Sequence, residues 1–418
     1  MKPTFVDFLV GEKDWLIERM RALGYRSDPL GVRFGVAYMG GQAILSGELE
    51  AFNLRLELLR RIPVADLAAK LEQMNQQLAK LTNEARLEAL REVKEKLKDL
   101  SKSAKSRLLK RVAEKLQSKV AGLASEERGL LDIQPFLDGV ELYHQAYLFP
   151  HLFAKKINTS EQKISSFLPL LMSLKSKSQG EIVQVDKFSG IYQNQELVTY
   201  FSGLRAALEK SPAFCSPLVV ILSGMFHTIA VGYEPRGKHW ILINAAELPA
   251  QRIEGDAMLA RKVSAAFSEG SLIALASEFY VAQDHKTVAK KQLRRWHQAG
   301  VWKKLHRVTS EKAKEADVSG TSWLWMAARQ GQMKMIKALL KAGAKPNQSR
   351  VDEAGPLYIA VKYGHEAVVE MLMDQGADPG QADTSGVSPL LMAGRQRDIE
   401  MIRILLGDLN RKKGKRGA

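Results

Sequence analysis

The sequence has a single cysteine, Cys215, among its 418 residues. One thiol excludes an intramolecular disulfide, and it excludes a zinc site built on several thiolates. No run of about 18 uncharged apolar residues occurs, so no membrane-spanning segment is predicted. Asp7, Glu12 and Asp14 interrupt the apolar residues of the N-terminal segment, which therefore lacks the core of a signal peptide. We predict a protein of a reducing cytosol, with neither a cofactor nor a metal ion.

Acidic residues are missing from two of the most basic segments. Residues 286–307 hold eight Lys or Arg side chains and residues 411–418 hold five, and neither segment contains Asp or Glu. Residues 91–119 add eleven cations against four acids. Because the formal net charge of the chain is +16, the rest of it is slightly acidic. The charge therefore indicates basic appendages on a nearly neutral body.

The C-terminal part of the chain repeats itself every 33 residues. Ala327, Ala360 and Ala393 share this interval, and Gly343-Ala344 recurs as Gly376-Ala377. Small alanines let two helices pack closely, and glycine ends the second helix in a left-handed conformation. This pattern is the signature of ankyrin repeats, although amphipathic helices could share a period by chance. We predict three repeats over residues 317–410, which form an all-α stack.

A segment without proline lies between Pro63 and Pro135. It carries apolar residues at helical spacing, and its first part follows a heptad pattern. We predict a helical hairpin or short coiled coil over residues 63–129, broken near 101–106. This segment is an insertion in an α+β body formed by residues 1–62 and 130–285.

Inside that body, the apolar pattern predicts one helix and several buried strands. The helix extends from Phe34 to Leu59. The strands cover residues 218–223, 227–233, 240–243 and 272–280. Helices and strands that follow one another in this irregular order are typical of an α+β domain.

Two polar residues near a predicted hairpin are the first candidates for catalysis. If Pro235-Arg236 forms a two-residue turn, His227 lies directly opposite Asn244, with Cβ atoms roughly 5 Å apart. An imidazole and an amide at this spacing can act as the base and the orienting group of a cysteine hydrolase. The alternative is a histidine that ends a strand beside a polar partner.

The nucleophile of such a site belongs at the start of a helix, where the positive end lowers the pKa of a thiol. The helix that begins near Gly31 has Arg33 at this position. Arginine is not a nucleophile, so the site is either inactive or built to hold an anion. Cys215 precedes a strand instead, as a small packing residue or, alternatively, as a displaced nucleophile.

Several segments together resemble a known group of proteins. Gly31-Val-Arg-Phe-Gly-Val-Ala-Tyr-Met-Gly-Gly-Gln-Ala-Ile-Leu resembles the nucleophile helix of papain-like cysteine-protease domains in translocated bacterial effectors. Asp138-Gly-Val-Glu-Leu-Tyr and the segments 222–233 and 240–245 are similar to other parts of these domains. With the ankyrin repeats, they resemble Legionella ankyrin-repeat effectors of the type IV (Dot/Icm) secretion system.

The resemblance implies a papain-like fold with its catalytic histidine at His227, its orienting residue at Asn244 and its cysteine at the position of Arg33. It implies an effector that enters the cytosol of a host cell, or its nucleus, and binds host proteins through its ankyrin repeats. The departure at Arg33 implies a degenerate scaffold. Two alternatives stay open: an active cysteine protease or acyl transferase that uses Cys215, and a basic adaptor for nucleic acid or an anionic membrane.

Aromatic residues near the repeats have two interpretations each. Trp296 and Trp302 lie among the cations of residues 286–307, which form either a binding surface or a structural connector over 286–316. Trp323, Trp325 and Tyr358 begin the first two repeats as packing residues or as a protein-binding patch. The basic tail, residues 411–418, has no large apolar side chain and is predicted to be disordered.

Overall fold

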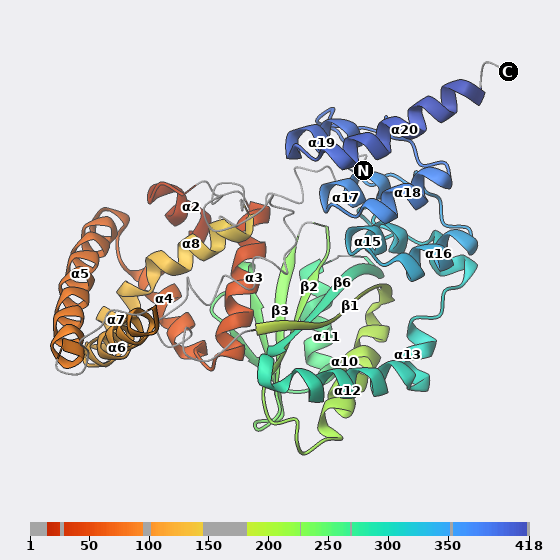
Figure 1. The fold of residues 1–418 in the computed structure, drawn as a ribbon. Coiled ribbons are helices and arrows are strands. Elements are labelled where there is room, and N and C mark those ends of the chain that lie inside the picture. Colours follow the sequence, from red (N-terminus) through yellow and green to blue (C-terminus); the bar gives the residue numbers. More distant parts are fainter. Residues whose placement is uncertain are drawn as a thin grey trace.

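The structure is a computed structural model, and it describes residues 15–25, 29–94, 102–144, 182–225, 227–267, 270–351 and 354–415. A six-stranded antiparallel sheet is covered by helices on both faces. A pair of long helices projects on one side, and a stack of short helices lies on the other (Figure 1). The predicted combination of a mixed helix and strand body with a C-terminal helical repeat region is confirmed.

The strands of the sheet follow the order β1-β6-β2-β3-β4-β5. They are β1 (Ile182–Gln193), β2 (Leu218–Ser223), β3 (Thr228–Glu234), β4 (His239–Asn244), β5 (Gln251–Ile253) and β6 (Leu272–Ala282). Every residue of β2 is buried. Because helices cover both faces, the central strands β2 and β3 are mostly apolar and do not alternate with polar residues.

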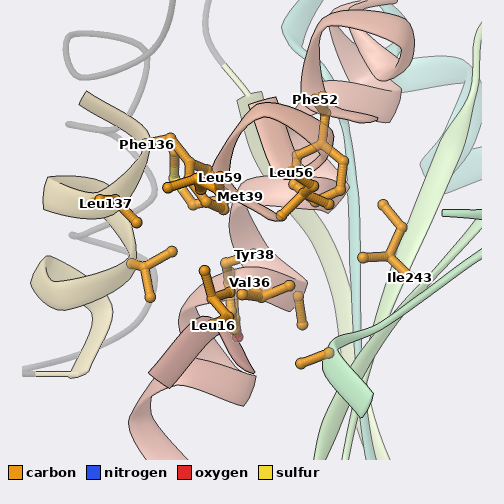
Figure 2. Close-up of a cluster of buried hydrophobic side chains, with 14 of the residues drawn as sticks. Leu16, Val36, Tyr38, Met39, Phe52, Leu56, Leu59, Phe136, Leu137 and Ile243 are labelled. Carbon is orange, nitrogen blue, oxygen red and sulfur yellow. The ribbon is translucent and has the colours of Figure 1, made fainter. Parts of the chain in front are cut away.

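Helix α3 (Pro29–Leu45) crosses one face of the sheet at close range. A Cβ atom at Gly40 would lie 2.5 Å from Ile243, and one at Gly41 would lie 3.0 Å from Val219. The helices α2 (Trp15–Ala22), α4 (Leu49–Arg61), α7 (Ser125–Leu131) and α8 (Ile133–His144) pack behind it. Their apolar side chains meet those of α3 in one core (Figure 2).

The single helix predicted from Phe34 to Leu59 is wrong. Helix α3 ends at Leu45 and α4 begins at Leu49, because Gly47 between them has a φ of +67°. A residue in this left-handed region ends a helix and turns the chain. The turn lets Phe52 fold back onto the core beneath α3.

Gly35 lets α3 and α8 cross, and alanine at this position is expected to be destabilising. A Cβ atom there would lie 2.5 Å from the backbone oxygen of Val140, so one helix must move. We expect Gly35→Ala to lower the free energy of unfolding by about 1–3 kcal/mol, measured by urea denaturation. Gly394→Ala in helix α19 (Pro389–Gln396) is the matched control. It meets no atom within 4 Å, and we expect it to be neutral or stabilising. Equal effects of the two changes would contradict this account of the crossing.

The other face of the sheet is covered by α10 (Asn194–Glu209), α11 (Asp256–Phe267) and α12 (Lys286–Gln298). Trp296 of α12 is 2% exposed and packs edge-on against Phe188 and Tyr200. Gly203 of α10 makes room for its indole, since a Cβ atom there would lie 2.9 Å from Nε1. Helix α12 thus contributes its apolar face to the second core.

A stack of three rings follows where α12 passes into α13 (Gly300–Leu305). The ring of Trp302 lies between those of His297 and His306, with centroid distances of 4.1 and 3.6 Å. Nε2 of His306 lies 2.7 Å from the hydroxyl of Tyr192 in β1. Residues 286–305 therefore turn their aromatic side chains inward, as a structural connector does.

Helices α5 (Val64–Lys94) and α6 (Lys102–Ala121) pack side by side as a helical arm away from the sheet (Figure 1). The Lys119 ammonium lies 2.8 Å from Glu88 and 3.2 Å from Glu84 of the facing helix. Lys115 lies 3.6 Å from Glu88. The predicted break lies partly outside the described residues, and α6 already begins at Lys102. A true coiled coil in this arm stays a prediction.

Six helices form the C-terminal stack after the short α14 (Ser310–Lys314). They are α15 (Trp323–Arg329), α16 (Met333–Lys341), α17 (Pro356–Lys362), α18 (Glu366–Asp374), α19 (Pro389–Gln396) and α20 (Ile399–Lys415). Helix α20 includes residues 411–415, where the sequence predicted disorder. Lys and Arg are good helix formers and extend a helix that is already nucleated. No helix in the described ranges is long and apolar enough to cross a membrane.

The first repeat closes the exposed edge of the sheet at β1. Nε1 of Trp323 donates to the backbone oxygen of Ser189 at 2.9 Å. The backbone N–H of Ser189 donates to Oε1 of Gln332 at 3.2 Å, and its hydroxyl donates to the same oxygen at 2.9 Å. These side chains satisfy the groups that another strand would bind. The body and the stack therefore share one core.

Candidate functional site

The hairpin that carries His227 and Asn244 differs from the prediction. The turn has four residues, 235–238, since Glu234 pairs with His239 and Lys238 adopts a φ of 49°. Asn244 consequently pairs with Ile229, and the predicted direct pairing with His227 is wrong. A shift of two residues keeps every side chain on its own face of a sheet. Nε2 of His227 still lies 2.7 Å from Oδ1 of Asn244.

A second hydrogen bond fixes the protonation of His227. Oδ1 of Asn244 also accepts the backbone N–H of Ala246 at 3.1 Å, which identifies this atom as the oxygen. The imidazole must then donate from Nε2, and Nδ1 keeps its lone pair. Phe267 packs edge-on against the ring, with centroids 5.7 Å apart. The imidazole is held as an orienting amide holds a catalytic base.

Arg33 is the residue that the sequence analysis places at the nucleophile position. It lies in the second turn of α3, close enough for its charge to act on the imidazole of His227. Burial, together with this cation, lowers the pKa of His227 to about 4. Such an imidazole is neutral at pH 7, but it is a weak base for proton abstraction. The structure thus brings Arg33, His227 and Asn244 together.

A buried carboxylate ties the helix of Arg33 to the sheet. Oε2 of Glu278 in β6 accepts from the hydroxyl of Tyr38 in α3 at 3.0 Å. It also accepts from Tyr280 at 2.6 Å and from Gln184 of β1 at 3.0 Å. The sequence analysis missed this network, because its members come from three elements and β1 was not predicted. The network positions α3 relative to the strands.

Cys215 lies far from the imidazole. It is exposed in the loop before β2, which pairs with β3 so that Leu218 faces Tyr233 and Ser223 faces Thr228. Cys215 is therefore at one end of β2 and His227 at the other. Six residues of strand span roughly 16 Å, at about 3.3 Å per residue. The hypothesis that Cys215 serves as a displaced nucleophile for His227 is wrong for this structure.

The three aromatic residues offered as a protein-binding patch are buried. Trp323, Trp325 and Tyr358 expose 0%, 3% and 8% of their surface. The guanidinium of Arg350 covers the ring of Trp325 at 3.9 Å, and the Tyr358 hydroxyl donates to Asp383 at 3.0 Å. The predicted protein-binding patch is therefore wrong, and the three aromatic residues are packing residues.

The sequence analysis missed the exposed tips of the loops that begin the first and third repeats. Asp317 and Asp383 each accept two backbone N–H groups of their own loop. Val318 is 47% exposed, and Thr384 is exposed at the same place in the other loop. The available signal was Asp-X-Ser-Gly, which occurs at 317–320 and at 383–386. The two loops therefore share one hydrogen-bonding pattern, and both expose the residue that follows the aspartate.

Comparison with known proteins identifies one family. The family described as "Ankyrin repeats (3 copies)" matches residues 324–415, which span the helices α15 to α20. The chain carries three ankyrin repeats in its C-terminal part, as the period predicted. No curated protein matches the chain. Ankyrin repeats indicate binding to other proteins.

Proposed function

We propose that this protein is an adaptor that binds a partner protein at the loop tips of its ankyrin repeats. The observation that carries the proposal is the rigid presentation of two equivalent tips, at Val318 and Thr384, by a stack fused to the body. Each tip is held by hydrogen bonds to one aspartate, so it loses little conformational freedom on binding.

We further propose that the body is a papain-like scaffold without hydrolase activity. The helix α3 packed on an antiparallel sheet and the contact between His227 and Asn244 support the papain-like part. Arg33 at the nucleophile position and the depressed pKa of His227 support the loss of activity. The position of Cys215 beyond the far end of β2 leaves the active protease or acyl transferase without a nucleophile.

The cellular setting that we propose rests on the resemblance to translocated effectors. Segments of α3, α8, β3 and β4 carry this resemblance, and the ankyrin repeats add to it. On this basis we propose a bacterial effector, delivered into a host cell by a type IV system, that binds host proteins.

Charge insertion at the loop tips tests the binding proposal. We expect Val318→Arg together with Thr384→Arg to reduce partner capture from a host-cell lysate at least tenfold, without changing the melting temperature. Leu87→Arg with Met258→Arg is the matched control, since both residues are exposed apolar side chains outside the stack. The readout is quantitative mass spectrometry of the captured proteins, followed by calorimetry with the purified partner. Equal capture by both double variants would refute the tips as the binding surface.

Point substitutions are preferred to deletion of the stack for a structural reason. Removing residues 317–410 would leave the β1 edge open at Ser189 and expose the apolar surface that α15 covers. The truncated body would then aggregate or unfold, and loss of capture would carry no information on binding.

A further inference from the structure

We infer that helices α12 and α13 form a second interaction surface, which binds double-stranded nucleic acid through its phosphates. The cations Lys291, Arg294 and Arg295 lie on the exposed side of α12. Lys303 and Lys304 of α13 and Arg307 after it are exposed as well. Among the residues that the structure describes, no acidic side chain forms an ion pair with any of these six. Their charge is therefore available to an outside partner.

Helix α6 is also basic, and several of its cations are paired with carboxylates. In α6, Lys115 and Lys119 face the carboxylates of α5, and Arg111 lies 3.4 Å from Glu114. These pairs neutralise much of the arm's positive charge. The six exposed cations have no such partners, because residues 286–307 contain no acid, Asp186 of β1 faces His297 at 3.2 Å, and the neighbouring Glu196 is bound to Lys312. These six exposed cations therefore form a basic surface whose charge no described carboxylate neutralises.

The burial of the apolar side chains of α12 and α13 determines which kind of polyanion this surface can bind. Trp296, Leu293 and Leu305 are at most 5% exposed, and Trp302 is stacked between two histidines. A surface helix binds a membrane by inserting apolar side chains, and it binds single strands by stacking bases on aromatic rings. In these two helices only Val301 is an exposed large apolar residue. The surface can therefore bind phosphate oxygens through its exposed cations.

Spacing on the helix supports a duplex as the ligand. Arg294 and Arg295 stand three and four residues after Lys291, so each lies beside Lys291 on the exposed side of α12, with Cβ atoms about 5–6 Å from that of Lys291. A duplex presents one negative charge per about 1.7 Å of its axis, and several such cations can bind it at once. Duplex DNA and duplex RNA offer the same phosphates to these cations.

Fluorescence anisotropy with duplexes of about 20 base pairs, one of DNA and one of RNA, tests the inference on the full chain. With six phosphate contacts, affinity should fall by about 10³ between 50 and 200 mM salt. Lys291→Gln, Arg294→Gln and Arg295→Gln together should bind at least tenfold more weakly at 50 mM salt. The slope of log K against log salt should become shallower by about 2.7, at about 0.9 per contact.

A triple variant in the helical arm tests whether binding depends on this surface or only on the net charge of the protein. Lys110→Gln, Arg111→Gln and Lys115→Gln remove the same net charge from α6, and the slope should stay that of the wild type. The inference is overturned if neither duplex binds at 50 mM salt, or if both triple variants weaken binding equally. It is also overturned if vesicles that contain phosphatidylserine bind the chain and the duplexes do not. Unchanged melting temperatures of the variants establish that folding is not the cause.

Discussion

Trp323→Ala should lower the free energy of unfolding of the whole chain by about 3–5 kcal/mol. The side chain is fully buried where the first ankyrin repeat meets the sheet. Its removal leaves a large cavity in the shared core, and it leaves the backbone oxygen of Ser189 without its indole donor. Because the body and the stack share this core, both should lose stability together.

Urea denaturation followed by circular dichroism measures the effect. Trp323→Phe keeps most of the volume and removes only the N–H donor, so we expect a smaller loss of about 1–3 kcal/mol. Val318→Ala, in the loop before α15, is the control and should change stability by less than about 0.5 kcal/mol. A Trp323→Ala protein as stable as the Val318→Ala control would show that the stack is merely tethered to the body.

Acid should destabilise the protein through two buried histidines. Burial, with the Arg33 cation, lowers the pKa of His227 to about 4, and burial lowers that of His306 to about 3. In the unfolded chain both titrate near pH 6.5. Below that pH each of these two imidazoles takes up a proton in the unfolded chain and not in the folded chain, so their contribution to stability is complete above pH 7 and falls as the pH decreases.

The size of the effect follows from about 1.4 kcal/mol per pH unit for each proton. Between pH 7.5 and 4.5 the two histidines together should cost about 5 kcal/mol of stability. Asp186 opposes them, since burial raises the pKa of its carboxyl to about 6 and the folded chain gains that proton first. A comparison of variants removes this opposing contribution.

The variant to compare is His227→Gln with His306→Gln, measured by urea denaturation at both pH values. Its loss of stability on acidification should be smaller than that of the wild type by about 5 kcal/mol. The comparison uses the difference in the free energy of unfolding between the two pH values. Packing lost through the substitutions lowers the stability equally at both pH values, so it cancels. Identical pH dependence of the two proteins would mean that these imidazoles are protonated in the folded state.

The ankyrin repeats and the central strands were predictable because each carries a simple pattern. Every repeat packs against the next in the same way, so Ala327, Ala360 and Ala393 recur at one interval. Strands covered on both faces become short apolar runs, as in β2 and β4. Strand β1 was missed because Asp186, Lys187 and Ser189 interrupt its apolar residues.

The residues of the candidate site were predictable from the sequence, but the strand register that places them was not. The left-handed conformation of Lys238 lengthens the turn and shifts the register by two residues, yet the side-chain period of two keeps His227 beside Asn244. The partner that buries Trp323 could not be predicted, because Ser189 at the edge of the sheet is distant in sequence. Long-range contacts of this kind leave no local pattern.

We propose that the ankyrin loop tips, and not the site of Arg33, His227 and Asn244, hold the partner. Capture from a cell lysate by three baits tests this most directly: the wild type, the double variant Val318→Arg and Thr384→Arg, and His227→Ala. We predict that the double variant loses the partner that the wild type retains, whereas His227→Ala captures it in full. The opposite pattern, with the partner lost by His227→Ala and retained by the double variant, would contradict the account.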